Sequence, residues 1–74
     1  MLDPMTSLTV KTGNKTRTVT LARLCDVLMP RRSDSIETLN AKLRAARRTI
    51  EQNPNARRAV SISIESIYEE IERR

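Results

Sequence analysis

The chain has 74 residues, and its 14 Lys and Arg outnumber its 9 Asp and Glu, which gives a formal net charge of +5. It contains no His, a single Cys and one aromatic residue, Tyr68, so an intrachain disulfide framework and a Cys/His zinc cluster are excluded. Without His, a second Cys or a Gly-rich phosphate loop, the usual catalytic groups are missing. We therefore expect no enzymatic activity, no cofactor and no metal.

The chain is short enough to form one domain at most, and its core must be built from Leu, Ile, Val, Met and Ala. Such a core is thin, so self-association is a natural way to bury more apolar surface. The first residues lack the basic and long apolar segments of a secretory signal, and no apolar run could span a membrane. Together with the single cysteine, this predicts a cytoplasmic protein.

Residues 1–6 are expected to form a flexible leader, and residues 7–20 a β-hairpin. Gly13-Asn14 suits a two-residue type II′ turn, in which the first central residue needs a positive φ. This turn pairs Thr12 with Lys15, Val10 with Arg17, and Leu8 with Val19. The Leu and Val residues then share one face of the hairpin, with Arg17 as the single charged residue among them.

A short helix is predicted for residues 21–29, with Thr20 as its N-cap. Its apolar face comprises Leu21, Leu24, Cys25 and Leu28. Pro30 ends the helix, because the residue before a proline is forced out of helical geometry. Cys25 is interpreted as a small core side chain, since no His is present to activate it.

The central helix is predicted for residues 34–52, starting at Asp34 with Glu37 reaching back to form a capping box. Apolar residues recur at intervals of three and four, which indicates an amphipathic helix. These residues are Ile36, Leu39, Leu43, Ala46 and Ile50. Asn53-Pro54 ends this helix, with Pro54 suited to the first position of the next one.

The last helix is predicted for residues 55–73, with Glu69–Arg73 and Glu70–Arg74 as favourable i,i+4 pairs. Residues 60–64 alternate apolar and polar side chains, so a strand at residues 59–64 that joins the hairpin is the alternative, although the helix is preferred. Apolar residues spaced four, three and four apart form a heptad-like seam. We expect a homodimer through this helix, with an interface of Val60, Ile64, Ile67, Tyr68 and Ile71.

The predicted fold class is therefore α+β, mostly α: an N-terminal hairpin followed by three helices, in a single domain of residues 7–74. Basic side chains are its most informative feature. Asn40, Arg44 and Arg47 lie along one flank of the central helix and are expected to contact DNA bases, because Asn and Arg read base edges through paired hydrogen bonds. A solvated arginine-rich surface and a contact to an acidic protein are the alternatives.

Phosphate contacts are expected from the remaining arginines near the helices. They are Arg31, Arg32, Arg48, Arg57 and Arg58. Arg57 and Arg58 fall in the first turn of the last helix, where the helix dipole disfavours cations, and a bound phosphate would offset that cost. Tolerated surface charge explains the pair equally well.

The order of short helix, basic connection and basic helix resembles that of helix-turn-helix regulators, although Met29-Pro30 stands where a small turn residue is expected. A ribbon-helix-helix arrangement fits less well. The predicted function is a small DNA-binding transcriptional regulator that uses helix 34–52 on duplex DNA. The alternative is a protein-interaction module, such as an adaptor, antitoxin-like inhibitor or anti-activator, that docks through residues 60, 64, 67 and 71 without nucleic acid.

Overall fold

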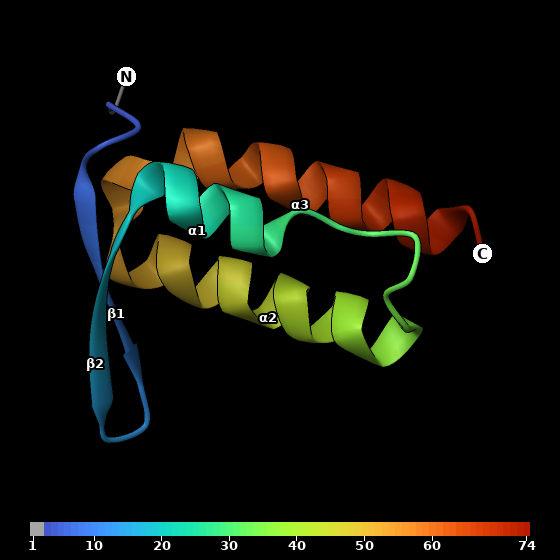
Figure 1. Ribbon diagram of the computed structural model, residues 1–74, viewed down its shortest axis with the longest axis horizontal. Coiled ribbons are helices and arrows are strands. Elements are labelled where there is room, and N and C mark those ends of the chain that lie inside the picture. The colour runs from blue at the N-terminus through green and yellow to red at the C-terminus, as the bar shows by residue number, and fades with distance from the viewer. Residues whose placement is uncertain (1–2) are drawn as a thin grey trace.

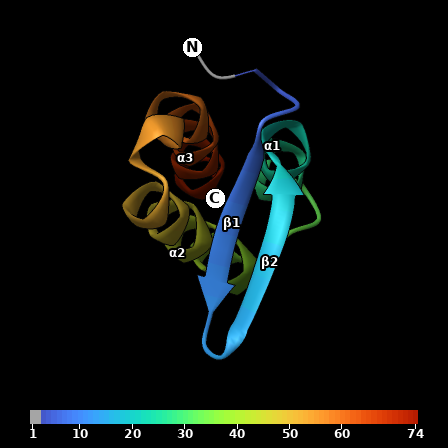
Figure 2. The ribbon, with the colours of Figure 1, turned by 90° about the vertical axis from the view of Figure 1, so that its left-hand side faces the viewer.

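Two strands and three α-helices follow one another along the chain, as the computed structural model describes it for residues 3–74. The elements are β1 (Ser7–Thr12), β2 (Lys15–Thr20), α1 (Leu21–Leu28), α2 (Ile36–Gln52), a 3-10 turn (Pro54–Ala56) and α3 (Arg57–Glu72). The helices lie side by side with alternating directions, and the hairpin stands across one end of them (Figures 1 and 2). The predicted fold class, a hairpin followed by three helices, is confirmed.

The hairpin has the predicted register, with Thr12 opposite Lys15, Val10 opposite Arg17 and Leu8 opposite Val19. Gly13 has φ 60°, and no other described residue has a positive φ, so the turn has the Gly-first pattern of type II′. Leu8 is buried, whereas Arg17 on the same face is exposed. The alternation of side chains therefore points the apolar face of the hairpin toward the helices.

The segment before β1 is hydrogen-bonded to α1 over the residues that the structure describes. The carbonyl oxygen of Thr6 accepts from the N–H of Leu21, and that of Pro4 accepts from the N–H of Ala22, both at 2.9 Å. Two N–H groups of the first turn of α1 thereby find acceptors. The flexibility predicted for residues 1–6 stays a prediction, and residues 1–2 lie outside the described part of the chain.

Helix α1 begins as predicted, because Thr20 Oγ1 accepts from the N–H of Arg23 at 3.2 Å. The start of α2 differs from the prediction. Its N-cap is Ser35, whose Oγ accepts from the N–H of Thr38 at 3.1 Å, and the helix begins at Ile36. The Asp34 carboxylate does not cap the helix, because it binds the N–H of Arg31 and the ammonium group of Lys42.

Residues 60–64 are helical, which confirms the preferred interpretation over a strand. The residue that suggested a strand, Ile62, is 63% exposed. The 3-10 turn has Pro54 at its start, as expected, and leads directly into α3. The pair Glu70–Arg74 forms at 3.3 Å, but Arg73 also pairs with Glu70 rather than with Glu69.

The core has two parts, which meet at the partly buried Ile64. One lies beneath the hairpin; it contains Leu8, Leu21, Leu28, Ala46, Ala56 and Val60. The other lies between α2 and α3; it contains Leu39, Leu43 and Ile67. Thr49 is also buried, because its hydroxyl donates to the carbonyl oxygen of Ala45 at 2.8 Å and so needs no water. Within residues 3–74, no helix is sufficiently long and apolar to cross a bilayer.

Candidate functional site

The solvent side of α2 carries four of the residues that the sequence predicts to contact DNA. We call these residues the basic face: Asn40, Arg44, Arg47 and Arg48. All four are exposed, while Leu39, Leu43 and Ala46 point from the other side of the helix into the core. The helical period thus separates the apolar stripe from the basic face and leaves the latter open to a partner.

The charges of the basic face are not neutralised within the chain. The ion pairs among the described residues join Lys42 to Asp34, and Arg73 and Arg74 to Glu70. Glu37 and Glu51 are exposed on the same helix but form no ion pair with its arginines. The guanidinium groups of the basic face are therefore available to an external anion.

Arg47 is held at the edge of the basic face nearest α3. Its guanidinium group donates a hydrogen bond to the hydroxyl of Tyr68, which is 40% exposed on α3. The sequence predicted Arg47 as a base contact and Tyr68 as an interface residue, and the fold brings the two together. This contact restricts the rotamers of Arg47 and thereby lowers the entropy it would lose on binding.

A second group of basic side chains lies on the hairpin, next to the C-terminal end of α2. We call these residues the hairpin arm: Lys11, Lys15 and Arg17. The side-chain amide of Gln52 accepts from the N–H of Lys11 at 2.8 Å and donates to its carbonyl oxygen at 3.1 Å. The amide of Asn53 donates to the carbonyl oxygen of Thr9 at 2.9 Å. These bonds attach the outer edge of β1 to α2 and satisfy backbone groups that an edge strand would otherwise leave open.

Beyond this attachment, the tip of the hairpin extends past α2 on the side away from α3 (Figures 1 and 2). It carries Lys11, Lys15 and Arg17, all exposed, and residues 7–20 include no acidic residue. Arg48 lies one helical turn before Gln52, so the hairpin arm continues the basic face around the end of the helix. Lys11 and Lys15 were not predicted to be contact residues, because their placement depends on the long-range bonds of Gln52 and Asn53.

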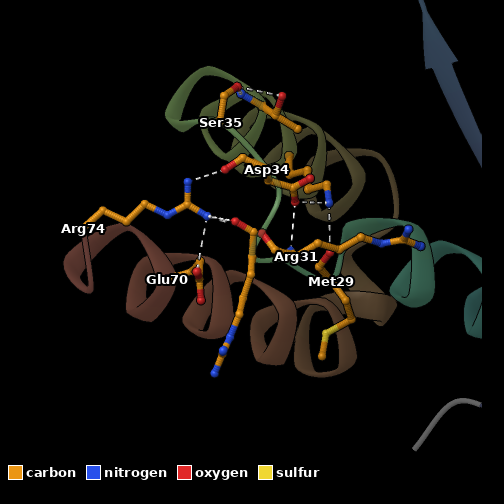
Figure 3. A network of polar contacts seen from close by, with 9 residues as sticks. Met29, Arg31, Asp34, Ser35, Glu70 and Arg74 are labelled. Atoms are coloured by element: carbon orange, nitrogen blue, oxygen red, sulfur yellow. Dashed lines mark hydrogen bonds and ion pairs between the residues drawn. The ribbon is translucent and has the colours of Figure 1, made fainter.

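The two predicted phosphate contacts that precede α2 lie at the far end of the helices. Arg31 and Arg32 are exposed, and their carbonyl oxygens accept from the Arg74 guanidinium at 3.4 and 2.9 Å. The carbonyl oxygen of Asp34 also binds Arg74 (Figure 3). The connection between α1 and α2 is thus fixed to the C-terminal end of α3, and it presents the two arginines beside the start of α2.

Lys42 completes this network from α2. Its ammonium group donates to the carbonyl oxygen of Met29 at 2.9 Å and lies 2.6 Å from Asp34 Oδ2 (Figure 3). The hydrogen bond from Lys42, followed by that from the N–H of Arg31, holds the pKa of Asp34 below its usual value. Lys42 therefore serves the fold, in contrast to the unpaired arginines of the basic face.

Arg57 and Arg58 are not part of the basic face. Both are exposed at the start of α3, as the sequence predicts, and no side chain caps this helix. Arg58 lines a groove between α1 and α3, and these two helices lie together on one side of α2 (Figure 2). The structure thus separates this arginine from Asn40, Arg44 and Arg47.

The predicted interface seam packs within the chain. Val60 and Ile67 are fully buried against α2 and the rest of the core, and Ile64 and Ile71 are partly buried there. The heptad-like spacing coincides with the face of α3 that packs on α2, so the fully buried Val60 and Ile67 are not open to a second chain. An interface at the partly buried Ile64 and Ile71 and the exposed Tyr68 stays a prediction.

The groove between α1 and α3 has a volume of about 390 Å³ and is mostly apolar. It is lined by Pro4, Leu21, Ala22, Cys25, Met29, Asn55, Arg58, Ala59, Ile62 and Ser63. Cys25 is partly buried there, and burial raises the pKa of its thiol, an effect that a hydrogen bond with Ser63 partly offsets. The sequence contained a signal for this groove in Ile62, which points away from the seam.

Comparison with protein-family models, curated protein sequences and solved structures gives no significant match. Function must therefore be inferred from the surfaces of the chain itself. Two surfaces stand out: the basic face with its hairpin arm, and the apolar groove on the opposite side of the helices.

Proposed function

We propose that this chain is a small cytoplasmic DNA-binding regulator that binds duplex DNA through the basic face of α2. The observation that carries the proposal is the set of exposed arginines on one side of one helix, none of which is paired with a carboxylate of the described chain. An α-helix fits the major groove of B-DNA, and cations that lack internal partners attract its phosphates.

In this proposal, Asn40, Arg44 and Arg47 face base edges. Arg can pair with guanine and Asn with adenine through two hydrogen bonds each. Phosphates near the C-terminal end of α2 would be contacted by Arg48 and by the hairpin residues Lys11 and Lys15. Phosphates near the N-terminal end of α2 would be contacted by Arg31 and Arg32. Arg57 and Arg58 are not assigned to this surface, because Arg58 lies in the groove on the opposite side of the helices.

The resemblance to helix-turn-helix regulators concerns the order of the elements more than their geometry. The connection from α1 to α2 runs from Met29 to Ser35, which is longer than a compact three- or four-residue turn. Helices α1 and α2 run in opposite directions beside each other (Figure 1). The hairpin arm, rather than α1, is therefore the element proposed to flank α2 on the DNA.

A direct test is the binding of a fluorescently labelled mixed-sequence duplex, followed by anisotropy. The variant Arg44→Glu/Arg48→Glu should bind at least about a hundred-fold more weakly than the unmodified chain, because one attractive contact to a base edge and one to a phosphate become repulsive. The control Arg23→Glu/Arg73→Glu has the same net charge but lies on other helices. Equal weakening by both variants would contradict the proposal.

A protein-interaction module remains the second candidate function, and the groove between α1 and α3 is the observation that favours it. Ile62 and Met29 border this groove and are 63% and 43% exposed. Exposed apolar side chains beside a groove are typical of protein contacts. Absence of any salt-sensitive DNA binding, with the protein folded, would favour this function over the regulator.

A further inference from the structure

The exposed surface of α3 beside the groove carries an ordered set of charges. Arg58 and Ile62 line the groove itself. Glu65 lines a neighbouring hollow that shares Arg58 and Ile62, and Glu69 follows one turn later along the helix. All three charged residues are exposed, and none forms an ion pair within residues 3–74. This surface therefore runs from basic through apolar to acidic.

Each charged end is unfavourable in the isolated chain. Arg58 lies in the first turn of α3, where the positive end of the helix dipole repels a cation. Glu65 and Glu69 are four residues apart on one helix, where like charges repel each other. A contact that places Arg58 of one chain beside Glu65 and Glu69 of another chain would relieve both repulsions.

We propose that the groove binds the same groove of a second copy of this chain, with the two α3 helices antiparallel about a two-fold axis near Ile62. The rise of a helix places Arg58 about 6 Å from the level of Ile62, and Glu65 and Glu69 about 4.5 and 10 Å away on the other side. About the two-fold axis, Arg58 of one subunit then lies at a level between Glu65 and Glu69 of the partner subunit. The symmetry repeats this contact of Arg58 with the two glutamates a second time.

The order of charges along this surface favours a second copy of the chain over a uniformly basic or acidic partner. A basic helix in the groove would face Arg58, and an acidic one would face Glu65 and Glu69, so each would meet repulsion at one end. A surface that is basic at one end and acidic at the other is complementary to itself when turned by 180°. Ile62 would lie at the centre of this interface, where an apolar residue excludes water.

The arrangement would leave both basic faces accessible. No residue of α2 lines the groove, so a dimer through the groove would not cover the arginines of α2. The self-association itself does not depend on nucleic acid. It can therefore be tested separately from the proposed DNA binding.

The experiment is a charge exchange followed by sedimentation equilibrium. The unmodified chain should form dimers, whereas Arg58→Glu and Glu65→Arg/Glu69→Arg should each raise the dissociation constant at least about tenfold, because like charges then meet across the axis. An equimolar mixture of the two variants should form a heterodimer, since each interface regains opposite charges. The controls are Arg23→Glu and Glu37→Arg/Glu51→Arg, which should dimerise as the unmodified chain does.

Cys25 provides a second measurement, because it lines the groove and is the only cysteine of the chain. Its reaction with Ellman's reagent should slow as the protein concentration of the unmodified chain rises. In Arg58→Glu the rate should be independent of concentration over the same range. A monomeric unmodified chain at about 1 mM, where even weak complexes form, would overturn the proposal. So would a mixture that associates no better than its separate variants.

Discussion

The side chain of Gln52 forms two hydrogen bonds with the backbone of Lys11, forty-one residues earlier in the chain. This contact attaches the hairpin to the end of the helix that carries the basic face. It links the fold to the proposed function, because it holds the hairpin that carries Lys11 and Lys15 against Gln52, one helical turn beyond Arg48.

Replacing Gln52 with Ala should release the outer edge of β1. The loss of two exposed hydrogen bonds should lower the free energy of unfolding by about 1 kcal/mol. It should also increase the hydrogen exchange rate of the Lys11 amide, measured by NMR, more than that of Val10, whose N–H faces β2. Glu51→Ala, one residue earlier and exposed, is the control. Unchanged exchange at Lys11 would show that Gln52 does not hold the hairpin.

Acid should weaken the connection between α1 and α2 through Asp34. Its folded pKa is lowered from the ordinary value of 3.8, chiefly by the hydrogen bond from Lys42. A lowered pKa means that the stabilisation is fully present above pH 3.8 and is lost as the pH falls through the folded pKa. The temperature of thermal unfolding should therefore fall more steeply below pH 4 for the unmodified chain than for Asp34→Asn. Parallel pH profiles would contradict this role.

The N-cap of α2 can be tested by a pair of serine substitutions. Ser35→Ala should lower the free energy of unfolding by about 1 kcal/mol, because the N–H of Thr38 loses its acceptor. Ser33→Ala, two residues earlier, should have an effect of less than about 0.5 kcal/mol. Urea denaturation at neutral pH measures both. An effect of Ser35→Ala no larger than that of Ser33→Ala would contradict Ser35 as the N-cap.

Local patterns predicted much of the fold. The Gly13-Asn14 turn and the alternation of residues 7–20 were sufficient for the hairpin register, and Thr20 for the start of α1. Asp34 was assigned wrongly as a cap because Ser35 is also a good cap, and only the packing of Lys42 beside Asp34 separates the two. The contacts of residues 4–6 with α1 could not be predicted, because they are backbone hydrogen bonds, which leave no side-chain pattern.

The candidate site shows the same limit. Helical spacing predicted the exposed flank of Asn40, Arg44 and Arg47 correctly. It could not show whether the seam of α3 packs on its own α2 or on a second chain, since both give the same spacing. The position of the hairpin arm could not be predicted, because it depends on hydrogen bonds from Gln52 and Asn53 to residues more than forty positions earlier in the chain.

Because the seam lies in the core, replacing two different isoleucines of α3 with Ala should lower the free energy of unfolding by different amounts. Ile67 is 0% exposed, so Ile67→Ala should lower the free energy of unfolding by about 3 kcal/mol, through lost burial and a cavity. Ile62→Ala should change it by about 0.5 kcal/mol or less. Both are measured by urea denaturation at micromolar concentration. A seam that served only to join two chains would show no such difference when the protein is dilute.

The central claim is that the basic face of α2 binds DNA phosphates and bases. Its most direct test is the slope of the logarithm of the DNA association constant against the logarithm of the salt concentration. Each phosphate contact contributes about −0.9 to this slope, so Lys15→Ala/Arg48→Ala, which removes two of the proposed phosphate contacts, should reduce its magnitude by up to about two. The control Arg23→Ala/Arg73→Ala, with the same net charge, should retain the slope of the unmodified chain. Binding that is independent of salt, or an equal change in both variants, would contradict the claim.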